Sequence, residues 1–188
     1  MVVADSDHAL SAVDVYSSFG RRTANLRPMT DPVTRASIED CLRSYCRGID
    51  RLHAPSVATA FHPGAILIDY GPQPLAIEAF VDSALPSLRK KFVATQHRIS
   101  NTTVEQDGDS ALVETYVHAT HVEESAEGRR LHTFVGRYID RFELRNGAWK
   151  IAHRTLRNDW STAEPMAPAM SGTYVPSGRG DSPDPIWG

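Results

Sequence analysis

The chain has 188 residues, with 20 lysines and arginines against 23 aspartates and glutamates, and a formal net charge of −3. This near-balance argues against a nucleic-acid-binding protein, because phosphate contacts require clustered basic charge. The length favours one domain, and a hydrophobic content of 41% is typical of a globular one. The two cysteines, Cys41 and Cys46, exclude a disulfide-rich fold and a cysteine-based zinc site.

Both ends of the chain differ from its middle. Residues 1–33 lack a sustained hydrophobic period, and residues 161–188 are rich in proline and glycine and contain the triplet Arg179-Gly180-Asp181. We interpret these segments as an N-terminal extension and a C-terminal tail around one domain at 34–160, and the match to the integrin-ligand triplet as coincidence. No stretch is long and apolar enough for a signal-peptide core or a membrane span, which predicts a soluble, cytoplasmic protein without a membrane partner.

In the first half of the domain, the apolar residues recur with the period of an α-helix. Thr34 or Ser37 can cap a helix whose apolar stripe follows a three-four spacing, and Pro55 fits the first turn of a short helix. A short apolar strand at 65–70 and a second long helix at 75–92 follow, and Pro86 should kink or split that helix. The predicted stripes are Ile38, Leu42, Tyr45, Ile49 and Leu52 in the first helix and Ile77, Phe80, Val81, Leu85, Leu88 and Phe92 in the second.

From Val93 onward the period changes to two, which indicates strands. We expect four in succession, and Asn146-Gly147 is a strong signal for a type I′ hairpin turn between the last two. Helices followed by a run of antiparallel strands predict an α+β fold, in which a curved sheet wraps the helices into a cone with a pocket at its open end. The predicted strands are 94–106, 110–124, 131–145 and 148–160.

Asp50 is the first chemical candidate, because it falls at the edge of the apolar stripe near the C-terminal end of the first helix. A carboxylate is disfavoured there by the negative end of the helix dipole, so a half-buried Asp50 needs a partner. The alternative is a solvated helix-end aspartate paired with Arg47 or Arg51.

His97 is the second candidate. By strand alternation it shares a face with Ile99, the inward face, where its ring N–H needs an acceptor. Asp50 is a candidate acceptor, since an aspartate fixes the imidazole tautomer and makes the far nitrogen a better base. The alternative is a core histidine bonded to a backbone carbonyl.

Four motifs in this order and spacing resemble one family. They are Gly48-Ile49-Asp50-Arg51, Ile68-Asp69-Tyr70, Thr95-Gln96-His97 and the segment 140–151. Over residues 34–160 the chain is similar to the SnoaL-like branch of the nuclear-transport-factor-two-like (cystatin-like cone) superfamily, whose members include scytalone dehydratase, hexachlorocyclohexane dehydrochlorinase and a bile-acid dehydratase.

The resemblance implies roles for particular residues. Asp50 and His97 match the catalytic Asp–His pair, Tyr45 matches a residue that aids the leaving group, and Tyr70 matches a tyrosine that polarises a substrate carbonyl through water. For Tyr45 the alternative is a core tyrosine, and for Tyr70 a residue at the rim of a strand end. Arg154 matches a pocket arginine, although strict alternation turns it away from Trp149 and Ile151 unless the strand carries a bulge.

Further residues complete the predicted site. His121 lies one position out of register from a second family histidine, and His118 competes with it. The predicted substrate-binding residues are His118, His121, Phe80, Tyr138 and Trp149, whereas His53, His62, His132 and His153 are interpreted as structural or surface positions. Asp50, His97 and His121 could in principle meet around a metal, but we expect no metal and no other cofactor.

Together these observations predict a lyase of the dehydratase or dehydrohalogenase type that acts on a small, largely apolar cyclic substrate by Asp–His general-base catalysis. An isomerase or polyketide cyclase could use the same pair, and a non-catalytic ligand-binding or assembly module is the alternative outside enzymes. The resemblance also implies a homo-oligomer, a dimer or a trimer, with a small molecule and no nucleic acid as partner.

Overall fold

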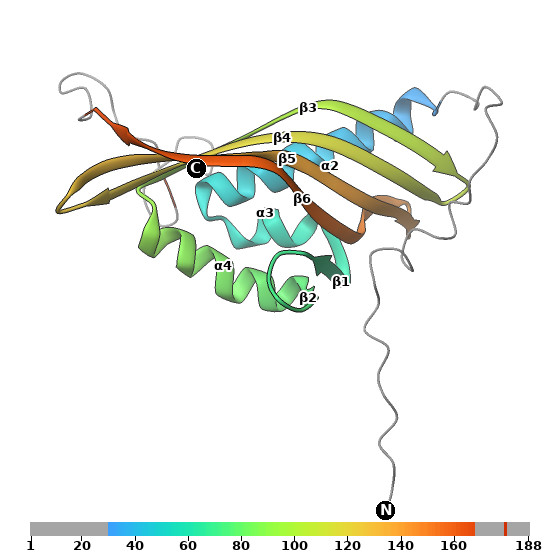
Figure 1. Cartoon of the computed structure of the whole chain (residues 1–188). Helices are drawn as coiled ribbons and strands as arrows, with labels where there is room; N and C mark the ends of the chain where they lie inside the picture. Colours follow the sequence, from blue (N-terminus) through green and yellow to red (C-terminus); the bar gives the residue numbers. More distant parts are fainter. Residues whose placement is uncertain (1–29, 168–178, 180–188) are drawn as a thin grey trace, which may run out of the picture.

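The computed structural model of the chain describes residues 30–167 and residue 179. Helices come first and long strands follow, as the sequence predicts (Figure 1). Most of the predicted N-terminal extension and C-terminal tail lies outside the described residues. The elements are α2 (Pro32–Arg51), α3 (Ala54–Thr59), β1 (Phe61–Ile68), β2 (Leu75–Ala76), α4 (Ile77–Lys91), β3 (Ala94–Asp107), β4 (Ser110–Ser125), β5 (Gly128–Arg145) and β6 (Ala148–Met166).

Helix α2 begins two residues before the earlier of the two predicted caps. Asp31 is the N-cap, and its carboxylate accepts the Thr34 N–H at 2.9 Å. The expected caps Thr34 and Ser37 were wrong, because Pro32 fits the first helical turn, where a missing N–H costs nothing. The predicted stripe is correct, since its members from Ile38 to Leu52 are all buried.

Helix α4 is continuous through Pro86, so the helix is not split there. A proline removes one helical hydrogen bond and leaves the carbonyl four residues earlier without its donor. Pro86 and Asp82 both lie on the exposed side of the helix, where water can bind that carbonyl.

The strands form one six-stranded mixed sheet in the order β2-β1-β6-β5-β4-β3. β1 runs parallel to β6 and all other neighbours are antiparallel. The four predicted long strands are present as β3 to β6. The strand predicted at 65–70 is β1, which starts earlier, at Phe61, and ends at Ile68, whereas residues 75 and 76, predicted as the start of a helix, form β2. Strand β6 continues to Met166, because residues predicted to belong to the tail pair with the start of β5, as in Arg129 with Met166.

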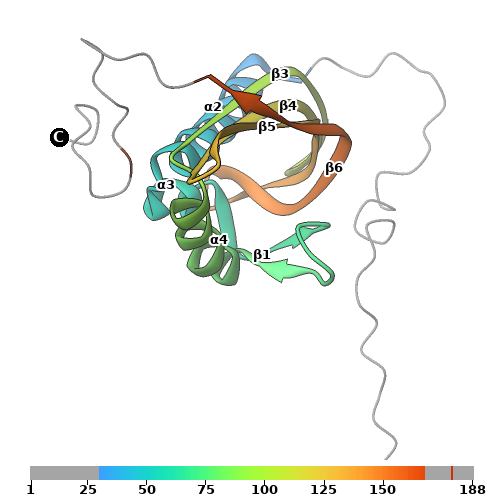
Figure 2. The same ribbon diagram turned by 60° about the vertical axis from the view of Figure 1, so that its left-hand side comes forward.

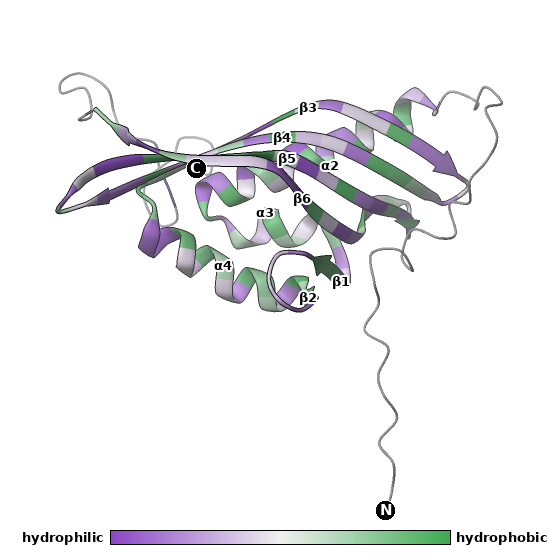
Figure 3. Cartoon of the chain, viewed as in Figure 1, coloured by the Kyte–Doolittle hydropathy of each residue, from purple (hydrophilic) through white to green (hydrophobic). Residues whose placement is uncertain are grey.

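The three helices lie on one face of the sheet, which curls around them (Figures 1 and 2). Hydrophobic and hydrophilic residues alternate along β3, β4 and β5, so each strand turns one side to the helices (Figure 3). This is the predicted α+β cone, with an open sheet. No helix among residues 30–167 combines the length and apolar character that crossing a membrane requires.

The two longest strands, β5 and β6, pack closely at a bulge. The pairing of β5 with β6 shifts between Val135 and Gly136, which leaves Asp159 unpaired. At this point an ideal Cβ on Gly136 would lie 1.9 Å from the carbonyl oxygen of Arg157. Glycine is therefore required at position 136 for the strands to approach each other.

We predict that Gly136→Ala lowers the free energy of unfolding by about 2 kcal/mol or more, because the strands must separate to admit the methyl group. Urea denaturation measures the change. Gly71→Ala is the matched control, since no atom lies within 4 Å of a Cβ at Gly71. Equal stability of the two variants would contradict the close approach.

Candidate active site

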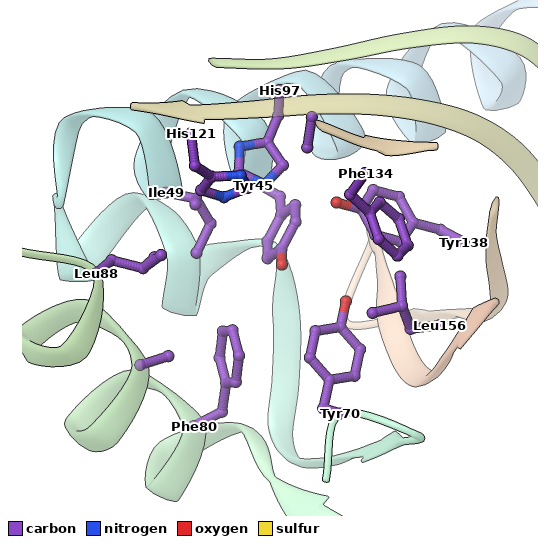
Figure 4. Close-up of a pocket in the computed structure, with 12 residues that line it drawn as sticks. Tyr45, Ile49, Tyr70, Phe80, Leu88, His97, His121, Phe134, Tyr138 and Leu156 are labelled. Carbon is purple, nitrogen blue, oxygen red and sulfur yellow. The ribbon is translucent and has the colours of Figure 1, made fainter. Parts of the chain in front are cut away.

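A cavity of about 260 Å³ lies between the helices and the concave face of the sheet (Figure 4). Its walls are mostly aromatic and aliphatic, with two histidines and three tyrosines as the polar groups. Its lining residues come from α2, the bend that follows β1, α4 and strands β3 to β6. They are Tyr45, Ile49, Tyr70, Phe80, Ala84, Leu88, His97, Ala119, His121, Phe134, Tyr138 and Leu156.

Asp50 and His97 are in direct contact at the edge of this cavity. Oδ1 of Asp50 lies 2.7 Å from His97 Nδ1, and Oδ2 accepts the His97 backbone N–H at 2.8 Å. Asp50 is only 7% exposed, so it is not the solvated aspartate of the alternative interpretation. A carboxylate can only accept, so we assign the proton to Nδ1, which leaves the Nε2 lone pair available to a molecule in the cavity.

His121 lies beside this pair, as the sequence suggested, while His118 does not. The ring centroid of His121 is 5.3 Å from that of His97 and 4.9 Å from that of Phe92. Burial, with the neighbouring His97 as a smaller cause, lowers the pKa of His121 to about 4, so this ring is neutral at neutral pH. Within the described residues no cluster of three metal-ligating side chains occurs.

Three tyrosines form the polar end of the cavity. The rings of Tyr45 and Tyr138 meet edge to face with centroids 5.8 Å apart, and the Tyr70 hydroxyl points toward this pair (Figure 4). The Tyr70 hydroxyl is buried and makes no well-formed hydrogen bond among the described residues, but it does interact with the Tyr45 hydroxyl. Burial raises the pKa of all three hydroxyls, which keeps them protonated and able to donate a hydrogen bond.

Arg154 lies behind the tyrosines and does not line the cavity, so its prediction as a pocket arginine needs correction. The bulge that alternation required is present, since the register shifts between Arg141 and Phe142 and turns Arg154 inward. Its guanidinium donates two 2.7 Å hydrogen bonds to Asp140, and both side chains are fully buried. The same guanidinium stacks on the rings of Tyr138 and Tyr45, at 3.9 and 4.3 Å from their centroids.

The other predicted substrate-binding residues divide into two groups. Phe80 and Tyr138 line the cavity, whereas His118 and Trp149 do not. His118 follows the outward alternation of β4, and its Nδ1 contacts Arg98 at 2.7 Å. Trp149 pairs with Leu144 beside the turn between β5 and β6.

Two residues of the site were missed from the sequence. Asp140 falls between Tyr138 and Phe142 on the inward face of a strand, so an isolated carboxylate at this position signals a buried cation. Phe134 lies four residues before Tyr138, and alternation alone places both on one face. The remaining missed lining residues are small or aliphatic and carry no chemical signal.

We predict that Asp140→Asn lowers the free energy of unfolding by about 3–5 kcal/mol, because it leaves the Arg154 charge buried without its counterion. Thermal and urea unfolding measure the loss. Asp159→Asn is the matched control, since Asp159 forms an exposed ion pair with Arg137 that contributes about 1 kcal/mol or less. A loss below that of the control would show that Arg154 does not depend on Asp140.

We also predict that His121 titrates near pH 4 in the folded protein. Its pKa is lowered from an ordinary value of 6.5, so its contribution to stability is complete above about pH 6.5 and is lost as the pH falls toward 4. NMR titration of the imidazole protons measures the midpoint, and His121→Gln assigns the signal. A midpoint at or above 6.5 would show that the ring is solvated.

Known structures share this fold. A proposed scytalone dehydratase from Novosphingobium aromaticivorans is 23% identical with a TM-score of 0.60, over 73% of this chain and 96% of that one. The hexachlorocyclohexane dehydrochlorinase LinA-type3 from Novosphingobium barchaimii is 19% identical with a TM-score of 0.61, over 76% and 96%. A protein of unknown function with a cystatin-like fold from Nostoc punctiforme is 15% identical with a TM-score of 0.52, over 69% and 93%.

No curated protein is significantly similar to the chain in sequence. The sequence does match the model of the SnoaL-like domain over residues 33–155, which is well over half of its length. That range holds almost all of α2, every cavity-lining residue except Leu156, and both members of the Asp50–His97 pair. The match confirms the resemblance inferred from the four motifs. The chain belongs to the SnoaL-like domain family.

Proposed function

We propose that this protein is a cofactor-independent lyase that removes a proton and a leaving group from a small, largely apolar cyclic substrate. The observation that carries the proposal is the contact between Asp50 and His97 at the wall of a small aromatic cavity. An imidazole held by a carboxylate is the arrangement that general-base catalysis requires. Two of the similar structures are described as a scytalone dehydratase and a dehydrochlorinase, which agrees with this reaction class.

His97 acts as the base in this reaction. Its Nε2 accepts a proton from a substrate carbon, and the bond electrons form the new double bond while the leaving group departs from the neighbouring carbon. Asp50 stabilises the imidazolium that forms and keeps the ring in its orientation through the contact with Nδ1. His121 is neutral and adds no positive charge that would oppose this proton transfer.

The tyrosine end of the cavity supports the second half of the reaction. Protonated Tyr45, Tyr70 and Tyr138 can donate hydrogen bonds to a substrate oxygen or a departing hydroxide or halide. The Arg154 charge lies directly behind Tyr45 and Tyr138, so it favours the negative charge that develops there. Tyr70 has the clearest role, because its buried hydroxyl makes no well-formed hydrogen bond in the described part of the chain and interacts there only with the neighbouring Tyr45 hydroxyl.

The size and character of the cavity restrict the substrate. Its volume of about 260 Å³ is below the usual 300–1,000 Å³ of drug-sized ligand sites, which suits a molecule of one or two rings. The aromatic and aliphatic walls would bind the apolar part of such a ring. The polar groups lie at two places only, the base at His97 and the hydroxyls of the tyrosines.

We predict that His97→Ala and Asp50→Asn reduce turnover of a hydroxylated or halogenated cyclic substrate, by about 10²–10⁴-fold for loss of the base. The assay follows release of water or halide from a panel of such compounds. His118→Gln is the matched control and should keep wild-type activity, because His118 lies outside the cavity. Equal rates in wild type and both site variants would refute the pair.

Running the reaction in deuterated water distinguishes a lyase from an isomerase. A lyase releases the leaving group, whereas an isomerase returns the proton and incorporates deuterium into an intact product. Deuterium incorporation that depends on His97, without release of a leaving group, would reassign the reaction and keep the base. A compound that binds in the cavity and never turns over would support a binding module.

A further inference from the structure

Arg179 of the C-terminal tail makes contacts at the base of the candidate site. Its Nε donates to the Asp50 carbonyl at 3.2 Å and its Nη1 to the Phe92 carbonyl at 2.6 Å. Its Nη2 lies 3.5 Å from the Thr95 hydroxyl. It is half-buried, although the domain ends far from it in sequence, at strand β6.

These acceptors belong to the elements that carry the Asp50–His97 pair. Asp50 lies in the last turn of α2, Phe92 is the C-cap of α4, and Thr95 precedes His97 by two residues in β3. The last carbonyls of a helix lack intrahelical donors, and a cation is favoured at that end by the helix dipole. A single guanidinium therefore stabilises the ends of two helices and joins them to the strand that holds the base.

Keeping the Arg179 guanidinium charged at this half-buried position costs free energy, which these contacts must offset. Burial lowers the pKa of Arg179, Arg51 and Arg89 lower it further by repulsion, and the Asp50 carboxylate opposes them. Among the described residues, the groups that favour a third arginine beside Arg51 and Arg89 are the Asp50 carboxylate and the carbonyls of Asp50 and Phe92. The fork of donors on a guanidinium matches this set of acceptors better than a lysine ammonium would.

We propose that Arg179 is a positioning residue that fixes Asp50 relative to His97 by joining the ends of α2 and α4 to the start of β3. It touches neither the cavity nor, in the proposed reaction, the substrate. The proposal of a catalytic effect rests on the proposed function, but the effect on geometry does not. This role gives the first residue of the Arg179-Gly180-Asp181 triplet a function within the chain itself.

The charge of Arg179 acts on a defined set of groups. Removing a cation near an imidazole favours its protonated form, so loss of Arg179 raises the pKa of His121. Arg179 already contributes to the lowered pKa of His121. The other groups that act on His121 are His97 on β3, His132 on β5 and Asp50 on α2.

The experiment compares full-length wild type with Arg179→Ala and Arg179→Lys. NMR titration gives the His121 midpoint, and the chemical shift of the His97 amide reports its hydrogen bond to Asp50. We expect Arg179→Ala to raise the midpoint by roughly 0.5–1 pH unit and to shift the amide signal. Arg179→Lys should restore the midpoint, since the charge returns, but not the amide shift, since the fork is lost.

Turnover provides the second readout. We expect kcat to fall about tenfold in Arg179→Ala with little change in KM, because the base and not substrate binding is displaced. Arg145→Ala, which removes an exposed arginine at the turn between β5 and β6, is the matched control. An unchanged midpoint and amide shift in Arg179→Ala would overturn the proposal even if the enzyme is active. A changed midpoint in a protein that turns over none of the compounds would support the positioning role of Arg179 and would refute the proposed lyase activity.

Discussion

The carboxylate of Asp50 connects the helical layer to the free edge of the sheet, and the arrangement of the site depends on this contact. β3 is an edge strand, so one row of its backbone groups has no neighbouring strand. Asp50 accepts the His97 N–H at that edge with one oxygen and contacts the His97 ring with the other. The same carboxylate thus substitutes for part of a missing strand and orients the imidazole. The His97 ring cannot move away from Asp50 without disturbing the hydrogen bond from the His97 backbone N–H.

The polar end of the cavity has a layered construction. Tyrosine hydroxyls face the cavity, the Arg154 guanidinium stacks behind two of the rings, and Asp140 lies behind the guanidinium. The charge is neutralised by its bidentate partner but remains close enough to polarise the hydroxyls. An arginine exposed in the cavity itself would bind anions directly, whereas this arrangement turns neutral donors toward an apolar cavity. The resemblance implied that Arg154 is a pocket residue, but the structure places it behind the tyrosines and outside the cavity.

Much of the fold could be predicted because local patterns determine it. The stripe from Ile38 to Leu52, the period of two after Val93 and the Asn146-Gly147 turn each depend on neighbours in sequence. The contact between Asp50 and His97 could also be predicted. The helical period places Asp50 at the edge of the apolar stripe, and strand alternation places His97 on the inward face. Their catalytic role still depends on the resemblance and on the experiments. What was missed depends on tertiary context: the exposed side of α4 tolerates Pro86, and the cap at Asp31 depends on where the chain enters the helix. The reach of Arg179 to α2 joins positions 129 residues apart, which no local pattern reveals.

The bulge in β6 makes the length of this strand as important as its composition. The stretch from Trp149 to Arg154 holds one residue more than regular pairing with β5 would allow, and this residue reverses the alternation. A regular strand of the same length, without the bulge at Ala152, would direct Arg154 toward solvent and leave Asp140 alone inside the protein. A relative with a regular strand must therefore be one residue shorter between these two positions to keep the same cation inside. An alignment gap of one residue in this short segment would mark a chain that has lost the bulge and kept the cation behind its tyrosines.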